Sequence, residues 1–243
     1  MVYLSSIIHH KTYLIMRISI VLPALFLLLF TSCKQYYTAS DFEEKTQSHQ
    51  TIAILPLEME FSGVQPRNFT PEIISAIEEN ESLLFQASFF NKILESTRRG
   101  KKQLKVDVQH FSKTRTLLEE NNITVRDSWF KDPSKLAEIL GVDAVVKGRI
   151  QKTRYFSDME SYGIETGKVI LDILTDRSIL SDVGTPNKNV NASYSLIEKD
   201  KGAVLWSIDF KQQADWNTSS EEIVNRINHR SARKFPYRVK KSR

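Results

Sequence analysis

No group of side chains along this chain has the types and spacing of a known catalytic or metal-binding motif. Cys33 is the only cysteine in 243 residues. A catalytic thiolate or serine hydroxyl needs a neighbouring base, most often histidine, but His49, His110 and His229 are isolated and the sequence contains no Gly-x-Ser-x-Gly motif. No two of these histidines have the spacing of metal ligands on a helix, and no acid-rich metal-binding loop occurs. We therefore predict no catalytic, cofactor-binding or metal-binding residue.

Two pairs of adjacent acids and one basic segment are the remaining candidates for chemistry. The pairs at residues 78–79 and 119–120 are glutamates on predicted helices, where adjacent side chains diverge. We expect them on solvated faces and not as an acid–base pair. The segment 99–102, Arg-Gly-Lys-Lys, lacks the first glycine and the Ser or Thr of a phosphate-binding loop. We expect the chain not to be an enzyme, with a hydrolase as the alternative because catalytic residues can be gathered from distant segments.

The sequence before Cys33 gives its thiol a different chemistry. A mainly apolar run of 13 residues, Ile18–Phe30, follows a basic start and leads into two small residues before Cys33. This arrangement resembles the signal peptide of a bacterial lipoprotein, in which cleavage before the cysteine frees its thiol and amine for acylation. The run is shorter than the roughly 20 residues of a membrane-spanning helix. We predict a signal peptide at residues 1–32, with the natural start at Met16, and lipidation by palmitate at Cys33. An uncleaved anchor and a soluble export signal are the alternatives.

Charge and length limit what the rest of the chain can be. Removal of residues 1–32, which hold two basic residues and no acidic one, leaves 211 residues with a formal charge of +3. This length fits one sizeable domain. Much of the positive charge lies near the C-terminus, where we predict a basic tail at 235–243. Such a tail can meet acidic lipid headgroups or a polyanion, but a solvated helix end is the simpler interpretation. Nucleic acid is not expected as a partner, because no aromatic–basic motif supports it.

The residues after the signal peptide predict a lipid-anchored polar tether at 33–50 and a single domain at 51–234. Periodic and alternating apolar patterns predict strands and helices in the order β, α, β, α, α, β, β, β, α. This order is typical of an α+β fold, in which helices pack on one face of a mixed β-sheet. The predicted elements are a strand at 51–57, one helix broken near 80–82 or two successive helices between 70 and 99, a strand at 104–109, helices starting at 112 and 133, a strand at 142–150, a helix at 164–174, a hairpin of 192–198 with 203–210, and a C-terminal helix opened by 219–222.

Three segments resemble a known family. They are 52–56, Ile-Ala-Ile-Leu-Pro; 136–150, a helix ending in Leu-Gly-Val-Asp-Ala before a strand that carries glycine; and 194–206, a hairpin ending in Gly-Ala-Val-Leu-Trp. They resemble the periplasmic lipoprotein domain of the curli-secretion (CsgG-like) family and its relatives, which include lipoprotein activators of peptidoglycan synthases. The resemblance implies a non-enzymatic envelope protein with an anticodon-binding-like fold. It implies no pore, because no stretch supplies four alternating membrane-spanning strands. Structural roles are predicted for Gly141, Asp143, Gly148, Gly202 and Trp206.

These observations together predict an outer-membrane lipoprotein that faces the periplasm and is held by its acylated Cys33. It is expected to act as a non-enzymatic assembly or accessory factor, through contacts with an envelope protein partner or as a homo-oligomer. An envelope hydrolase and a small-ligand-binding lipoprotein are the alternative functions. An accessory factor predicts that changes in clefts are tolerated, whereas changes in a surface patch break a complex.

Overall fold

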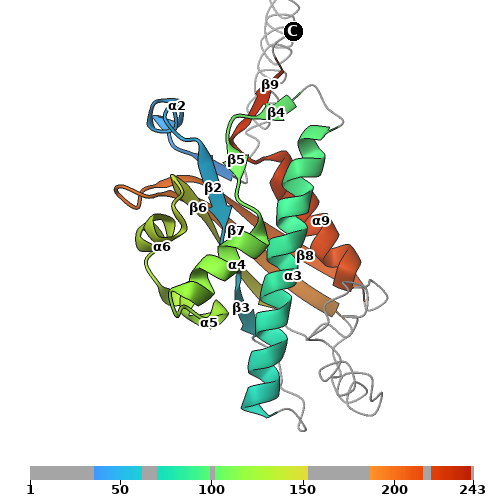
Figure 1. Cartoon of the computed structure of the whole chain (residues 1–243). Helices are drawn as coiled ribbons and strands as arrows, with labels where there is room; N and C mark the ends of the chain where they lie inside the picture. Colours follow the sequence, from blue (N-terminus) through green and yellow to red (C-terminus); the bar gives the residue numbers. More distant parts are fainter. Residues whose placement is uncertain (1–35, 62–69, 99–101, 153–186, 216–219, 242–243) are drawn as a thin grey trace, which may run out of the picture. The chain divides into compact units, whose positions relative to one another are not determined.

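The computed structural model describes residues 36–61, 70–98, 102–152, 187–215 and 220–241. Within these ranges a seven-stranded mixed sheet forms the centre, accompanied by a separate two-stranded sheet (Figure 1). The strand order is β1-β8-β7-β6-β2-β5, and β3 also pairs with β6. All of these elements belong to one compact unit. The α+β class predicted from the sequence is therefore confirmed.

Strand β6 is where the parallel and antiparallel halves of the large sheet meet, since it pairs in parallel with β2 and β3 and antiparallel with β7. The strands of the large sheet are β1 (Tyr36–Thr38), β2 (Thr51–Ile54), β3 (Glu58–Phe61), β5 (Asp107–Val108), β6 (Ala144–Lys152), β7 (Asn187–Glu198) and β8 (Val204–Asp215). The small sheet consists of β4 (Lys102–Leu104) and β9 (Arg238–Lys240). The helices are α2 (Phe42–Lys45), α3 (Pro71–Arg98), α4 (Phe111–Glu120), α5 (Val125–Phe130), α6 (Pro133–Leu140) and α9 (Ser220–Arg233).

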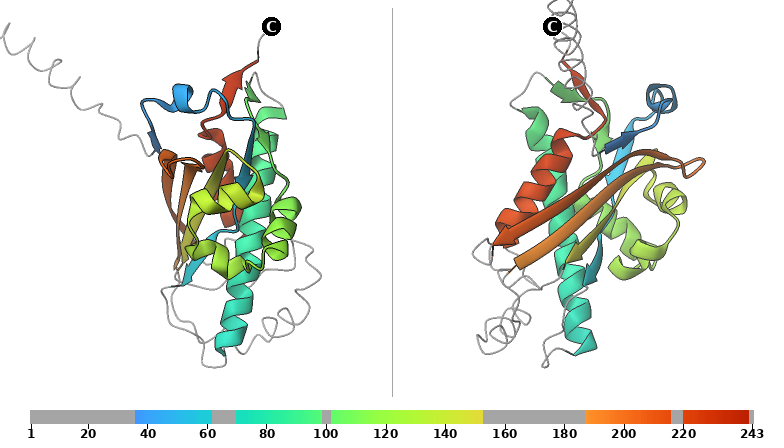
Figure 2. Two further views of the ribbon diagram at one scale, coloured as in Figure 1. Left: turned by 60° about the vertical axis from the view of Figure 1, so that its left-hand side comes forward. Right: turned by 180° about the vertical axis from the view of Figure 1, so that it is seen from behind.

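The two faces of the large sheet are covered differently, because side chains alternate between them along each strand. On one face Ile54 and Val146 belong to the larger apolar core, which includes the inner sides of α3 and α9. On the other face Leu55 and Val145 form a smaller cluster with α6 residues such as Leu136. Helices α3 and α9 lie side by side along the sheet, and α4, α5 and α6 are grouped away from α9 (Figure 2). The two longest helices thus share the predicted face, and residues of α4 and α6 add a smaller layer on the second.

The start and the end of α6, and the turn between β7 and β8, have well-defined local geometry. The carboxylate of Asp132 accepts a hydrogen bond from the backbone N–H of Ser134 at 3.0 Å, and Pro133 takes the first helical position of α6. Gly141 ends this helix with a φ of 65°, and Gly202 has a φ of 63° in the turn between β7 and β8. Both values lie in the left-handed region, which glycine adopts without a steric penalty.

Asp143 ties together three strands at one end of the sheet. Its carboxylate accepts hydrogen bonds from the backbone N–H groups of Gln50 at 2.7 Å and Thr51 at 2.9 Å. Its own N–H donates to the carbonyl oxygen of Thr51 at 2.9 Å, and the N–H of Lys199 donates to its carbonyl oxygen at 3.0 Å. The start of β2, the start of β6 and the end of β7 are therefore joined at one residue, which confirms the predicted structural role.

Gly148 and Trp206 also have the structural roles predicted for them. A Cβ atom on Gly148 would lie 3.0 Å from Cγ of Leu57 and 3.1 Å from Cδ1 of Tyr194, so any larger residue would force these side chains apart. The Trp206 side chain is fully buried and meets the ring of Phe235 edge-on, with 5.7 Å between the ring centroids. Both residues act through the core and not through an exposed site.

Helix α3 is one continuous helix of 28 residues, so the predicted break near residues 80–82 is wrong. Glu81 and Ser82 are buried against neighbouring elements, and the side-chain amide of Asn80 donates to the carbonyl oxygen of Ala76 at 2.8 Å. Polar residues that indicated a break instead make tertiary contacts or bond to the helix backbone. In the described part of the chain, no helix, α3 included, combines the length and apolar character needed to cross a membrane.

Residues 36–50 and 235–241 fold onto the domain, which corrects the predicted tether and basic tail. Strand β1 pairs with β8, and strand β9 pairs with β4. Phe42 and Tyr237 are buried and contact each other, with ring centroids 5.4 Å apart. A few apolar side chains in each polar segment are enough to dock it, and they are too sparse to produce a periodic pattern.

Smaller differences concern short elements. The strand predicted at 104–109 is two short strands in different sheets, β4 and β5. The predicted elements do not include β3 or α5, although α5 begins with a capping box between Thr124 and Asp127. The helix predicted at 164–174 lies outside the described residues.

Replacing Asp143 by Asn is expected to lower the free energy of unfolding at neutral pH by about 1–3 kcal/mol, since two backbone N–H groups lose a charged acceptor. Partial burial raises the pKa of the Asp143 carboxyl, but the N–H groups of Thr51 and Gln50 outweigh it, so the pKa is below its ordinary value of 3.8. This contribution to stability is present above the ordinary value and is lost as the pH falls through the folded-state pKa. Denaturant unfolding at neutral and acid pH should therefore show a smaller loss on acidification for Asp143→Asn than for the wild type. Asp200→Asn, at an exposed position, is the matched control, and equal pH dependence of Asp143→Asn and wild type would contradict the assignment.

Candidate functional site

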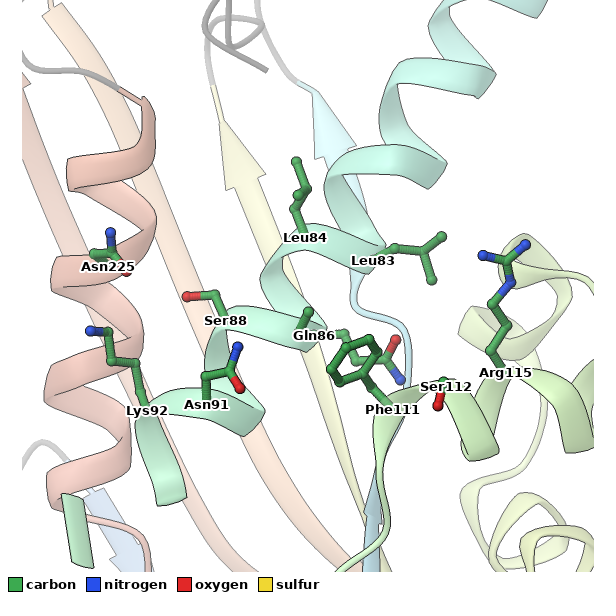
Figure 3. A pocket seen from close by; sticks show the side chains of 11 residues that line it. Leu83, Leu84, Gln86, Ser88, Asn91, Lys92, Phe111, Ser112, Arg115 and Asn225 are labelled. Atoms are coloured by element: carbon green, nitrogen blue, oxygen red, sulfur yellow. The ribbon is translucent and has the colours of Figure 1, made fainter. Parts of the chain in front are cut away.

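A groove of about 520 Å³ runs over the outer side of α3 between α4 and α9 (Figure 3). Leu83, Leu84 and Ala87 of α3 and Phe111 at the start of α4 supply its apolar lining. Leu83 and Ala87 are half-buried and Leu84 is buried, and the opposite side of α3, including Phe85, lies in the core. The groove exists because α4 and α9 pack on α3 from two sides and leave the helix surface between them open.

Neutral polar side chains line the rest of the groove. They are Gln86, Ser88 and Asn91 of α3, Ser112 of α4 and Asn225 of α9. The Gln86 amide donates to the carbonyl oxygen of Ile54 at 2.6 Å, which fixes it against the sheet. Ser88 is buried, and its hydroxyl has no hydrogen-bond partner among the described residues. The groove therefore presents hydrogen-bond donors and acceptors beside apolar surface.

Two cations stand at opposite sides of the groove, Lys92 toward α9 and Arg115 on α4 (Figure 3). Lys92 pairs with Glu95 at 2.9 Å and Arg115 pairs with Glu119 at 2.7 Å, each within its own helix. Among the described lining residues there is no histidine, cysteine or carboxylate. The Ser112 hydroxyl of this lining lies 2.7 Å from Nδ1 of His110, a contact within the cap of α4. The arrangement is otherwise suited to binding a neutral, partly apolar group.

The three histidines considered as catalytic candidates lie in separate places. His49 contacts the hydroxyl of Tyr237 through Nδ1 at 2.6 Å, and burial lowers the pKa of its imidazole. Nδ1 of His110 accepts a hydrogen bond from the backbone N–H of Ser112 at 3.2 Å and so caps α4. His229 is exposed on α9. The fold uses two of these residues to hold backbone and side chains in place and brings none of the three together.

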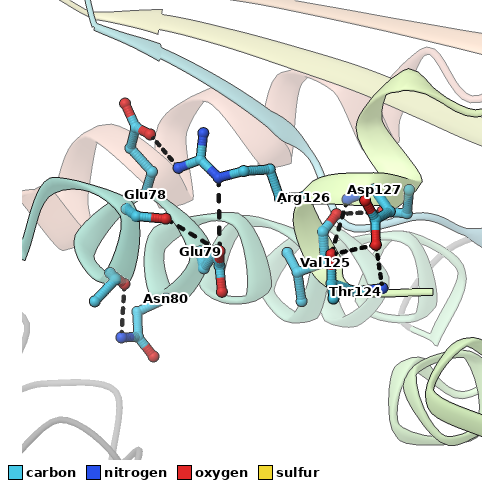
Figure 4. Close-up of polar contacts among 10 residues, drawn as sticks. Glu78, Glu79, Asn80, Thr124, Val125, Arg126 and Asp127 are labelled. Carbon is cyan, nitrogen blue, oxygen red and sulfur yellow. Dashed lines mark hydrogen bonds and ion pairs between the residues drawn. The ribbon is translucent and has the colours of Figure 1, made fainter. Parts of the chain in front are cut away.

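The paired acids of α3 connect this helix to α5 (Figure 4). Arg126 of α5 pairs with Glu78 at 2.6 Å and with Glu79 at 3.6 Å. The Glu78 side chain is only 12% exposed, so the prediction of a solvated face is wrong for this residue. The guanidinium of Arg126 also lies 4.9 Å from the ring centroid of Trp129. These carboxylates therefore link two helices and do not form an acid–base pair.

A buried ion pair joins Lys152 at the end of β6 to Glu81 of α3, and each side chain is 1% exposed. Burial lowers the pKa of the Lys152 amine to about 7, and the nearby Glu78 carboxylate opposes this shift. A lysine with such a pKa can serve as a base in an enzyme, but this amine is engaged by Glu81 and closed off from solvent. The burial of Lys152 could have been predicted from the sequence. Alternate residues of a strand face the same side, and Lys152 faces the same side as the buried residues Gly148 and Ile150.

Cys33, the single residue with a predicted functional modification, lies outside the described residues. The description begins three positions later, at Tyr36, where the chain is already paired with β8. Lipidation of Cys33 remains a prediction.

Comparisons with known proteins give similarity at the level of structure. No protein-family model matches the sequence, and no match was found among curated proteins. The structure is similar to lipoprotein GNA1162 from Neisseria meningitidis, with 19% identity over 76% of this chain and 96% of that chain and a TM-score of 0.44. It is also similar to a PelC dodecamer from Paraburkholderia phytofirmans (10% identity, 76% and 86% coverage, TM-score 0.37) and to the LpoB C-terminal domain from Salmonella enterica (8% identity, 71% and 93% coverage, TM-score 0.32). All three similarities are at low sequence identity and at TM-scores below 0.5.

The role of the buried pair can be tested by removing one or both charges. Lys152→Met is expected to lower the free energy of unfolding by about 3–5 kcal/mol, because it leaves the buried carboxylate of Glu81 unpaired. The double variant Lys152→Met with Glu81→Leu should recover most of this loss, since apolar residues of similar volume then fill the site. Denaturant unfolding measures both, with Arg115→Met at an exposed pair as the control, expected to cost about 0–1 kcal/mol. A double variant as unstable as the single one would show that the pair has another role.

Proposed function

We propose that this chain is a lipid-anchored lipoprotein of the bacterial envelope that acts as a non-enzymatic assembly or accessory factor. Removal of residues 1–32 and acylation of Cys33 would hold it in the outer membrane, facing the periplasm. Its partner in this proposal is another envelope protein, which it binds through the groove on α3. Assembly of several copies of this chain is a variant of the same proposal.

The observation that carries the proposal is the composition of the groove on α3. Its apolar residues, such as Leu83 and Phe111, match the side chains of a polypeptide segment, and amides such as Asn91 match its backbone N–H and carbonyl groups. The two cations at its sides are already paired within their own helices, so the groove does not require an anionic ligand. A segment of a protein partner fits this chemistry.

The use of candidate catalytic side chains for structure supports a non-enzymatic role. His110 caps α4, Glu78 joins α3 to α5, and Lys152 joins the sheet to α3. Each of these three side chains has a structural partner within the fold. Replacing a residue that makes such a structural contact lowers the stability of the fold.

A small-ligand-binding lipoprotein is the second candidate, and the size of the groove favours it. A volume of about 520 Å³ lies within the range of about 300–1,000 Å³ found for small-molecule sites. The unpaired hydroxyl of Ser88 would have a role in such a site. A small ligand would raise the melting temperature with its concentration, whereas a protein segment would be recovered as a crosslinked adduct.

Acylation is tested first, in bacteria supplied with radiolabelled palmitate. The wild-type protein is expected to incorporate the label and to stay with the membrane fraction. Cys33→Ala is expected to lose the label, because the acylated thiol is gone. A labelled Cys33→Ala protein, or an unlabelled wild type, would refute the lipid anchor.

Partner binding is tested by a photo-crosslinking amino acid placed at Ala87, inside the groove, and at Leu94 as the control. Leu94 lies on the same helix, is 41% exposed and does not line the groove. A discrete adduct with an envelope protein is expected from position 87 and not from position 94. Leu83→Arg should abolish that adduct with little change in melting temperature, whereas Leu94→Arg should leave it intact. Equal adducts from both positions, or an adduct that survives Leu83→Arg, would refute binding in the groove, and an adduct between two copies would identify a homo-oligomer.

A further inference from the structure

The position of β1 limits how far the domain can lie from a lipid on Cys33. Tyr36 is paired with Ile208 of β8, so its place on the edge of the sheet is fixed. Three residue steps separate Cys33 from Tyr36, and an extended chain covers at most about 3.3–3.6 Å per residue, or about 10 Å in all. If Cys33 carries the lipid, as the proposed function states, β1 must remain within this distance of the headgroups.

A cationic surface lies directly beside β1. Arg230, Arg233 and Lys234 are exposed at the C-terminal end of α9 and just beyond it. The ammonium group of Lys234 lies 5.3 Å from the ring centroid of Tyr36, so this end of α9 touches β1. Glu222, an acid on the same helix, pairs with Arg226 nearer the other end. Helix α2, which follows β1, carries acids, but Asp41 pairs with Lys45 and Glu43 with Lys105. The positive charge beside β1 lies at the end of α9.

An exposed aromatic side chain stands on the other side of the same strand. Successive side chains of a strand point to opposite faces, so Tyr37 points away from the face on which Tyr36 meets Lys234. Tyr37 is 53% exposed. Tyrosine is enriched at the interface between lipid and water, where its ring meets the headgroup region. Both sides of β1 thus carry groups suited to this interface.

We propose that the edge of the domain formed by Tyr37, Arg230, Arg233 and Lys234 lies against an anionic lipid surface. The short connection brings this edge to the headgroups, and basic residues near such a surface are attracted to anionic lipids. Helices α4, α5 and α6 lie on the opposite side of α3 from α9 (Figure 2) and extend into the aqueous space. This inference rests on the proposed acylation of Cys33 and adds the orientation of the domain on the membrane.

The test uses full-length acylated protein in vesicles that contain phosphatidylglycerol. Because the lipid blocks the thiol of Cys33, one introduced cysteine provides a unique labelling site. Fluorophores at Thr38→Cys on β1 and His229→Cys on α9 should be quenched several-fold more strongly by nitroxide-labelled headgroups than a fluorophore at Glu138→Cys on α6. All three positions are exposed. Equal quenching at the three positions would overturn the proposed orientation.

Charge reversal separates electrostatic recognition from the effect of the short connection alone. The variant Arg230→Glu, Arg233→Glu, Lys234→Glu should reduce quenching at Thr38→Cys to the level found in vesicles of phosphatidylcholine. The matched control reverses three exposed cations on the α4–α6 side, Lys113→Glu, Lys131→Glu and Lys135→Glu, and should leave the quenching unchanged. Melting temperatures establish that both variants fold, and glutamine at the same three positions of the edge replaces glutamate if folding is lost. Equal effects of the two triple variants would overturn recognition of anionic lipid.

The remaining outcomes distinguish this inference from the proposed function. Protein that incorporates no palmitate refutes the lipid anchor itself. Protein that is acylated but unquenched at Thr38→Cys and His229→Cys overturns only the orientation. If those positions instead crosslink to an envelope protein, the edge belongs to a protein partner and the proposal is wrong.

Discussion

The buried contact made by Tyr194 holds the sheet and its two long helices together. Its ring lies 4.5 Å from that of Phe89 on α3, and its hydroxyl donates to the side-chain oxygen of Asn228 on α9 at 2.5 Å. The amide of Asn228 in turn donates to the carbonyl oxygen of Phe85 at 3.3 Å, back on α3. A buried hydroxyl or amide without a hydrogen-bond partner costs about 1–3 kcal/mol. Tyr194 and Asn228 therefore favour the one arrangement of the sheet, α3 and α9 in which both side chains are hydrogen-bonded. Gly148, paired with Tyr194 in the sheet register, leaves room for the ring, and burial raises the pKa of Tyr194 and keeps its hydroxyl a neutral donor.

This arrangement determines what α3 and α9 can offer to other molecules. Phe85 and Phe89 commit one side of α3 to the core, so Leu83 and Ala87 are left on its outer side, where they line the groove. On α9, Ile223, Ile227 and Asn228 are buried, whereas Arg230 and Arg233 are exposed and carry positive charge outward. The same packing that satisfies the buried polar groups therefore creates both the groove and the cationic edge. A change in the core that tilts either helix would alter both surfaces at once.

The parts of the fold that depend on neighbouring residues could be predicted from the sequence, and the parts that depend on distant partners could not. Gly141 and Gly202 act within a few residues of their own position, and each has the structural role predicted for it. The contact of Glu81 with Lys152 joins residues from α3 and β6, and β1 is fixed by pairing with β8 near the other end of the chain. The groove draws its lining from α3, α4 and α9, so no sequence pattern within one segment describes it. The prediction for Cys33 also rests on a local signal, the run of residues directly before it.

Because residues 36–50 pack on the domain, the proposed lipid anchor would hold the domain closer to the membrane than a flexible tether would. A flexible tether of 17 residues would let a domain explore the space some tens of ångströms from the membrane, where it could meet partners at many heights. With β1 fixed on β8, a lipid on Cys33 would be joined to the domain by only a few residues and would confine the domain to the membrane surface. A partner for the groove on α3 must then either lie at that surface or send a segment to it. Confinement also raises the effective concentration of the domain toward membrane-bound partners, so an accessory protein of this kind can act through an interface of modest intrinsic affinity.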